Sequence, residues 1–268
     1  MNDMGFSDAI ALLAWQVELG VDECIADAPV NRYELPAVQP KPAAMAKPAP
    51  ATAKPDAKGA APPVPPAAPK VDAVALAERA AAGAATLADL RAAMEAFEHC
   101  DLKKGARNLV FSDGMAGARV MVVGEAPGRD EDREGKPFVG AAGQLLDAMF
   151  DAIGRGRTRE DAGLYITNVL PWRPPQNREP KPDEIAMMKP FLERHIALAE
   201  PDVLVIMGNV SAQALLGKRG ITRLRGDWTE ACGKPALPMF HPAYLLRNPA
   251  AKREAWADLL SLKSRLRA

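Results

Sequence analysis

The hydrophobic pattern of the chain changes its period several times between residue 72 and the end. Short apolar runs, typical of strands covered on both faces, alternate with stretches in which apolar residues recur at helical spacing. The runs predict strands at 119–123, 164–168, 202–207 and near 237–240. The periodic stretches predict helices at 72–82, 87–99, 142–153, 182–199, 209–216 and 250–267. This alternation predicts an α/β fold with three α/β/α layers around a central parallel sheet of four strands.

The first part of the chain has a different pattern. Residues 7–19 carry apolar positions on one side and predict a short helix. Ala and Pro fill 23 of the 35 positions in 36–70, which leaves little to bury and prevents regular structure. We therefore predict a helical head at 1–35, a disordered linker at 36–71 and a globular domain at 72–268. The head either docks back on the domain, recruits a protein partner or is a marginal helix without one.

Charge adds one qualification to this picture. The 34 basic and 34 acidic residues cancel overall, but seven acidic residues and one basic residue give 1–35 a net charge of −6. Residues 88–268 hold 27 basic and 24 acidic residues, a net charge of +3. A mild basic excess suits brief contact with phosphates, although an ordinary solvated surface explains it equally well.

Composition also bears on the expected location. The sequence contains no apolar run of about 18 residues, and its first residues do not resemble a secretory signal. The three cysteines, Cys24, Cys100 and Cys232, lie too far apart for a disulfide framework. We therefore expect a cytoplasmic protein without a membrane segment, and nothing in the sequence requires more than a monomer.

A glycine-rich motif follows the first predicted strand. Residues 124–132 read GEAPGRDED, and small residues let a backbone approach a ligand closely. The spacing matches neither a phosphate-binding P-loop nor a dinucleotide fingerprint. The acidic cluster at 130–132 lacks a further ligand nearby, which favours a solvated acidic turn over a metal site.

Two more motifs follow later strands. Asn168 ends a strand, and its amide supplies the donor and the acceptor that a base edge needs. A proline-rich segment with Arg173 follows it, which a stiff surface loop would also explain. His241 starts the third motif, HPAYLLRNP, in which two exposed leucines would wedge between bases and an arginine would hold phosphate. A single histidine is more often structural, so this motif alone leaves its role open.

Taken together, these motifs resemble the uracil-DNA glycosylase superfamily, most closely its family 4 enzymes. The matched stretches are 124–146, 167–184 and 240–249, with weaker similarity over 92–267. The resemblance implies that 72–268 is a catalytic domain that flips uracil out of DNA and hydrolyses its N-glycosidic bond without a catalytic metal. It thus implies an enzyme of DNA base excision repair whose partner is uracil-containing DNA.

The resemblance also implies residue roles in uracil binding. Phe138 would stack on the flipped base, and Asn168 would bind its Watson–Crick edge and reject cytosine. Gly124 and Ala126 would line the pocket with backbone. His241 would lie against the carbonyl that gains charge as the bond breaks.

Less direct roles follow for other residues. The best-known branch of the superfamily has a water-positioning aspartate where this chain has Ala126, so Glu125 and Glu131 become the candidates. The residues implied in DNA contact are Leu245, Leu246, Arg247 and, in the second motif, Arg173.

The chain departs from family 4 at the positions of its usual 4Fe-4S cluster, which four cysteines hold. Only Cys100 matches a ligand position, and the other three hold Phe97, Trp172 and Met188. We therefore predict no cluster and no other cofactor, and an apolar plug in its place. Two alternatives remain: a glycosylase for another deaminated base such as hypoxanthine or xanthine, and a non-catalytic DNA-binding or replication-associated module.

Overall fold

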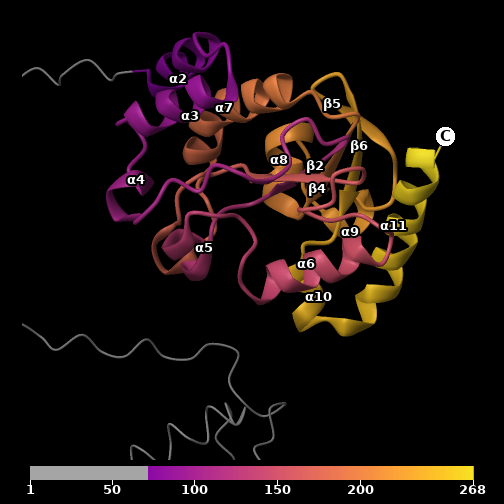
Figure 1. The fold of residues 1–268 in the computed structure, drawn as a ribbon. Helices are drawn as coiled ribbons and strands as arrows, with labels where there is room; N and C mark the ends of the chain where they lie inside the picture. The colour runs from indigo at the N-terminus through magenta and orange to yellow at the C-terminus, as the bar shows by residue number, and fades with distance from the viewer. Residues whose placement is uncertain (1–71, 268) are drawn as a thin grey trace, which may run out of the picture. The chain divides into compact units, whose positions relative to one another are not determined.

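The structure is a computed structural model that describes residues 72–267 (Figure 1). The predicted head at 1–35 and the linker at 36–71 lie outside the described residues, so the proposed division of the chain stays a prediction. No helix in the described part is long and apolar enough to span a bilayer.

A six-stranded sheet forms the centre of the domain, with the strand order β1-β3-β2-β4-β6-β5. The strands are β1 (Asp113–Gly114), β2 (Val120–Gly124), β3 (Leu164–Asn168), β4 (Val203–Met207), β5 (Thr229–Ala231) and β6 (Lys234–Met239). The neighbours β3, β2, β4 and β6 pair in parallel, as predicted. The count of four strands is wrong for the whole sheet, because β1 and β5 add antiparallel edges. These edges have two and three residues, too few for a recognisable apolar pattern.

The long helices agree with the sequence pattern, and the short ones were not predicted. Helices of eight or more residues are α2 (Ala73–Ala82), α3 (Leu87–Ala96), α6 (Ala141–Asp151), α7 (Pro182–Ala199), α8 (Asn209–Leu216) and α11 (Lys252–Arg267). Shorter ones are α4 (Leu102–Gly105), α5 (Arg129–Glu134), α9 (Ile221–Leu224), α10 (Pro242–Arg247) and the 3₁₀ turns η1 (Pro175–Asn177) and η2 (Pro249–Ala251). One or two turns of helix are too short to reveal a 3.6-residue period.

The strands separate two hydrophobic cores, which confirms the three-layer fold. Alternate side chains of a strand point to opposite faces, so Met121 and Val123 join one core while Val120 and Val122 join the other. Helices α2, α3, α7 and α8 supply the first core. Helices α6 and α11 supply the second, and Figure 1 shows them on the opposite side of the sheet from α2, α3 and α7.

The parallel strands all end at the same edge of the sheet. Gly124 and Asn168 end β2 and β3 in register, and Gly208 and His241 follow β4 and β6 closely. The ladder continues past the strand ends, because Val169 N–H donates to the Gly124 carbonyl at 3.0 Å. In parallel sheets this edge is where ligand sites form.

Candidate active site

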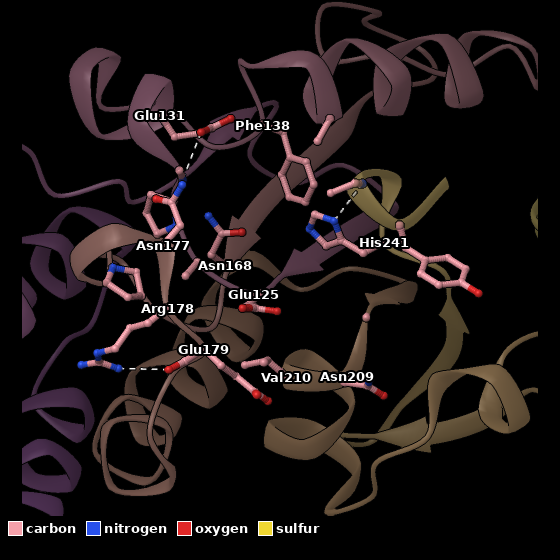
Figure 2. Close-up of a pocket in the computed structure, with 18 of the residues that line it drawn as sticks. Glu125, Glu131, Phe138, Asn168, Asn177, Arg178, Glu179, Asn209, Val210 and His241 are labelled. Carbon is pink, nitrogen blue, oxygen red and sulfur yellow. Dashed lines mark hydrogen bonds between the residues drawn. The ribbon is translucent and has the colours of Figure 1, made fainter. Parts of the chain in front are cut away.

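A cavity of about 620 Å³ opens at this edge, and it is lined from the ends of all four parallel strands (Figure 2). Its walls include seven of the residues singled out from the sequence: Glu125, Ala126, Glu131, Phe138, Asn168, His241 and Arg247. Gly124 lies directly behind two of them, as its packing shows. The structure therefore brings the three sequence motifs together around one space.

Gly124 allows a close approach of two side chains to the backbone in this site. A Cβ at this position would lie 2.4 Å from Asn168 Oδ1 and 2.6 Å from two atoms of the Phe138 ring. Any side chain at residue 124 would therefore displace both the amide and the ring. The glycine lets an aromatic face and a hydrogen-bonding edge approach the same point of the backbone.

The side-chain amide of Asn168 is available to a ligand. The residue is buried, with 7% of its surface exposed, and it forms part of the cavity wall. None of the side-chain hydrogen bonds within 72–267 engages this amide. An amide in this state offers one acceptor and one donor pair to a planar partner. Figure 2 shows it facing the space beside Phe138 and His241.

The rings of Phe138 and His241 stack against each other at the side of this space. Their ring centroids lie 5.4 Å apart, and the ring planes are inclined by 25°. His241 caps the start of α10, and its Nδ1 accepts the Ala243 N–H at 3.2 Å. A cap at Nδ1 leaves the proton of the neutral ring on Nε2.

His241 is in the protonation state of a neutral hydrogen-bond donor. Burial and, to a smaller degree, the charge of Arg247 lower the pKa of His241 to about 4, against the opposing charge of Glu131. The ring is therefore uncharged at neutral pH and presents an Nε2–H group. A neutral imidazole of this kind can donate a hydrogen bond to an oxygen that gains negative charge.

Glu125 supplies a carboxyl group to the cavity wall. Burial raises the pKa of Glu125, the nearby charge of Glu179 raises it too, and Arg219 counteracts both. Glu179 and Arg219 form an ion pair between the segment after η1 and the turn after α8. Sequence reasoning missed Glu179 and Arg219, which line the cavity together with the first residues of α8. The sequence does contain a signal for the first residues of α8: Gly208 directly follows a buried strand, just as Gly124 ends one.

Glu131 lines the cavity but is occupied by backbone donors. Its Oε2 accepts the Gly128 N–H at 3.0 Å, and its Oε1 accepts Val139 N–H at 3.0 Å and Gly140 N–H at 2.9 Å. Glu131 therefore joins the glycine motif to the segment that carries Phe138. This arrangement favours a role in holding the loop over a role in positioning water.

The acidic cluster is not the solvated turn that the sequence suggested. Residues 129–134 form α5, and Asp132 is buried, where its Oδ1 accepts the Arg107 N–H at 2.8 Å. Within the described residues, no group of three or more His, Cys, Asp and Glu side chains is arranged to hold a metal ion.

The predicted DNA-contacting residues differ in their exposure. Leu245 was expected to be exposed, and this is wrong: only 1% of it is accessible, because α10 turns it into a small core with Phe240 and Ala255. Leu246 is 45% exposed, and Arg247 is exposed at the end of α10. Arg173 lies outside the cavity wall, and its Nε donates to Asn177 Oδ1 at 2.8 Å.

The residues around Cys100 do not fit an iron–sulfur cluster. Phe97, Cys100, Trp172 and Met188 all lie in one buried apolar cluster, with exposures of 6%, 1%, 3% and 0%. Burial raises the pKa of the Cys100 thiol, which disfavours the thiolate that metals bind. The other described cysteine, Cys232, is exposed in the turn between β5 and β6. One thiol and three side chains without a thiolate cannot supply four sulfur ligands.

Comparisons with known proteins identify the family of this chain. A family model described as the uracil DNA glycosylase superfamily matches residues 111–260. The type-4 uracil-DNA glycosylase of Archaeoglobus fulgidus is 42% identical over 168 residues, which are 59% of this chain and 82% of that protein. Its counterpart in Thermotoga maritima is 43% identical over 154 residues, 56% and 77% of the two chains. A third, from Pyrobaculum aerophilum, is 37% identical over 188 residues, 64% and 91% of the two chains. The chain belongs to the uracil-DNA glycosylase superfamily.

Proposed function

We propose that this protein is a uracil-DNA glycosylase of base excision repair. It flips uracil out of DNA and hydrolyses the N-glycosidic bond, which leaves an abasic site. One observation supports this most strongly: an aromatic face (Phe138), an unengaged amide (Asn168) and a neutral N–H donor (His241) share one cavity.

Base selection follows from these groups. Uracil stacks on the ring of Phe138, which replaces the stacking lost from the duplex. Asn168 Oδ1 accepts the N3–H of uracil, and its Nδ2 donates to the O4 carbonyl. An amide held in one orientation meets cytosine with acceptor against acceptor and donor against donor. The mismatch leaves buried polar groups without partners, which disfavours cytosine.

Bond cleavage separates charge in a defined direction. The C1′–N1 bond breaks with both electrons passing to N1, so uracil leaves as an anion and the sugar becomes oxocarbenium-like. The Nε2–H of His241 donates to the uracil carbonyl oxygen on which that charge accumulates. Water then adds its oxygen to C1′ and gives up one proton to a neighbouring carboxylate, while the uracil anion takes up one proton, so the products are an abasic sugar and neutral uracil.

Glu125 is the carboxylate we assign to this water. It lies on the cavity wall, where burial and the nearby charge of Glu179 raise its pKa against the opposing charge of Arg219. A raised pKa makes a carboxylate a better proton acceptor than an exposed one, provided that it is ionised. Glu131 is assigned instead to the loop, because three backbone N–H groups already occupy its oxygens.

DNA contact is assigned to the end of α10. Leu246 is exposed beside Arg247, and Arg247 lines the cavity. The leucine would fill the gap left by the flipped base, and the arginine would hold a phosphate. Arg173 is a further phosphate contact on the neighbouring rim.

The protein is proposed to work without an iron–sulfur cluster. Phe97, Trp172 and Met188 bury apolar surface in the cluster that also contains Cys100. Such burial stabilises a fold by roughly 25 cal/mol for each Å² removed from water. We infer that this apolar plug joins α3, α7 and the strand-end loop that a cluster would otherwise hold.

One assay separates the proposal from its alternatives. The full chain is incubated with oligonucleotides that carry uracil, hypoxanthine, xanthine or only normal bases, and abasic sites are then cleaved with alkali. Cleavage at uracil alone is expected. Cleavage only at a purine would favour another deaminated base, and binding without cleavage of any strand would favour a non-catalytic module.

A further inference from the structure

Phe138 has a backbone conformation that needs support. Its φ is 55°, in the left-handed region that a residue with a Cβ rarely adopts. Its carbonyl also lies directly against α6, because a Cβ on Gly143 would be only 1.8 Å from the Phe138 oxygen. The ring can keep its place beside His241 only while neighbouring groups hold this backbone.

Two charged side chains bind the backbone of residues 137–140: one accepts from its N–H groups, and the other donates to its carbonyls. Glu131 accepts the N–H groups of Val139 and Gly140, as described above. Arg157 donates from Nη1 to the Pro137 carbonyl at 2.8 Å and from Nη2 to the Phe138 carbonyl at 2.5 Å. The fork of the guanidinium therefore holds two consecutive carbonyls, one on each side of the Phe138 Cα.

Arg157 is itself held in place. Its Nε donates to Asp147 Oδ1 of α6 at 2.7 Å, and its Nη1 lies 2.8 Å from Asp113 Oδ2 of β1. Only 13% of its side chain is exposed. The short edge strand β1 and the helix α6 thus fix a guanidinium that fixes the loop. Arg157 does not line the cavity, so any effect on uracil acts through Phe138.

The geometry points to Arg157 as a positioning residue for uracil release, which holds Phe138 in its left-handed conformation and its ring in the stacking plane. This inference rests on the proposed function. Lysine cannot replace the arginine, because one ammonium group cannot reach two carbonyls and two carboxylates in the plane of a fork.

A double-mutant cycle on uracil release tests this role. Arg157→Met is expected to lower kcat/KM about 10- to 100-fold, as misplacement of a binding group does. In the Phe138→Ala background the same substitution should change kcat/KM by less than about twofold, because coupled residues are not additive. Effects that multiply in full would overturn the proposal.

Two further variants control for general loss of structure. Arg159→Met removes an exposed arginine two residues away, whose partner is Asp151, and should leave kcat/KM unchanged. Arg157→Lys keeps the charge. It should show a cooperative thermal unfolding transition like that of the wild-type protein, while its kcat/KM is still reduced. Full activity of Arg157→Lys would contradict the need for a fork.

Amide exchange gives a readout that does not depend on activity. Mass spectrometry of the peptide that contains Val139 and Gly140 should show faster exchange in Arg157→Met than in the wild-type protein or Arg159→Met. Equal exchange in all three would overturn the role of Arg157. If the wild-type protein released no uracil, the proposed function would fail, and the exchange comparison would still decide whether Arg157 holds the loop.

Discussion

The strand-end pocket holds the residues that the resemblance to family 4 enzymes implies, and the surroundings of Cys100 do not hold the cysteines that it implies. In the pocket, Phe138, Asn168 and His241 are all present and converge on one cavity. Around Cys100, the three other positions that the resemblance assigns to cluster ligands hold the buried apolar side chains of Phe97, Trp172 and Met188. Both regions belong to a single chain of the uracil-DNA glycosylase superfamily.

The difference reflects what each region has to supply. Recognition of a base needs particular donors and acceptors, and an apolar substitute would leave buried polar groups unpaired. A structural link between loops needs only to hold those loops in one arrangement. Packed apolar side chains can do this as well as an iron–sulfur cluster can. The pocket should therefore tolerate few changes, and the apolar plug should tolerate changes that keep its volume.

The largest expected effect is the loss of a pocket group. His241→Ala and Asn168→Ala should each lower the rate of uracil release by about 10²–10³-fold, since each removes a hydrogen-bonding group aimed at the base. Single-turnover release from a uracil oligonucleotide measures this. His99→Ala, a substitution of an exposed histidine, is the matched control and should keep full activity. Full activity in both pocket variants would show that the site is elsewhere.

The two leucines of α10 should respond in different ways. Leu245→Ala removes a buried side chain and should lower the free energy of unfolding by about 2–5 kcal/mol. Leu246→Ala should change stability by less than about 0.5 kcal/mol, because the residue is exposed. It should instead slow uracil release from double-stranded DNA. Denaturant unfolding and uracil-release assays on both variants measure these effects. Equal losses of stability and of release rate in the two variants would contradict the assignment of Leu245 to the core and of Leu246 to DNA contact.

The pH dependence should separate Glu125 from His241. His241 acts as a neutral donor and its pKa is about 4, so its active form is lost only as the pH falls through about 4. Glu125 acts as a carboxylate and its pKa is raised, so its active form is lost at a higher pH than that of an ordinary glutamate. We expect kcat to fall on the acid side with the titration of Glu125.

Glu125→Gln provides the control for this profile. The variant should be slower at neutral pH, and its remaining activity should fall only near the pKa of His241. A wild-type acid limb near the ordinary histidine value of about 6.5, unchanged in Glu125→Gln, would contradict the assignment of both groups.

The smallest expected effect on activity comes from Cys100. Cys100→Ala should leave uracil release unchanged and cost only about 1 kcal/mol of stability, as a small core truncation does. The purified wild-type protein should contain no iron and lack the broad absorption near about 400 nm of an iron–sulfur protein. Iron bound through Cys100, lost together with stability in Cys100→Ala, would show that the apolar plug does not replace a cluster.

Local patterns were sufficient for most of the fold and for the centre of the site. Buried strands and long helices leave a regular pattern in sequence, and parallel strands must end at one edge. The positions of Asn168 and His241 after such strands therefore predicted that they would meet. In the structure, Asn168 and His241 do line the same cavity, because both follow parallel strands that end at one edge of the sheet.

Other features depend on contacts that the sequence does not reveal. The exposure of Leu245 was mistaken because α10 is too short to show which side it buries. The partners of Glu131 lie up to nine residues away, and those of Arg157 lie up to 44 residues away. The ion pair of Glu179 with Arg219 joins two loops 40 residues apart. Such roles follow from packing and not from any local pattern.

The most direct test of the account is the position of uracil in a structure of this protein with the free base bound. We predict its ring face on Phe138, its N3–H and O4 edge on the Asn168 amide, and its O2 carbonyl within hydrogen-bonding distance of His241 Nε2. Uracil bound outside this cavity, or inside it without contact to Asn168 and His241, would contradict the account.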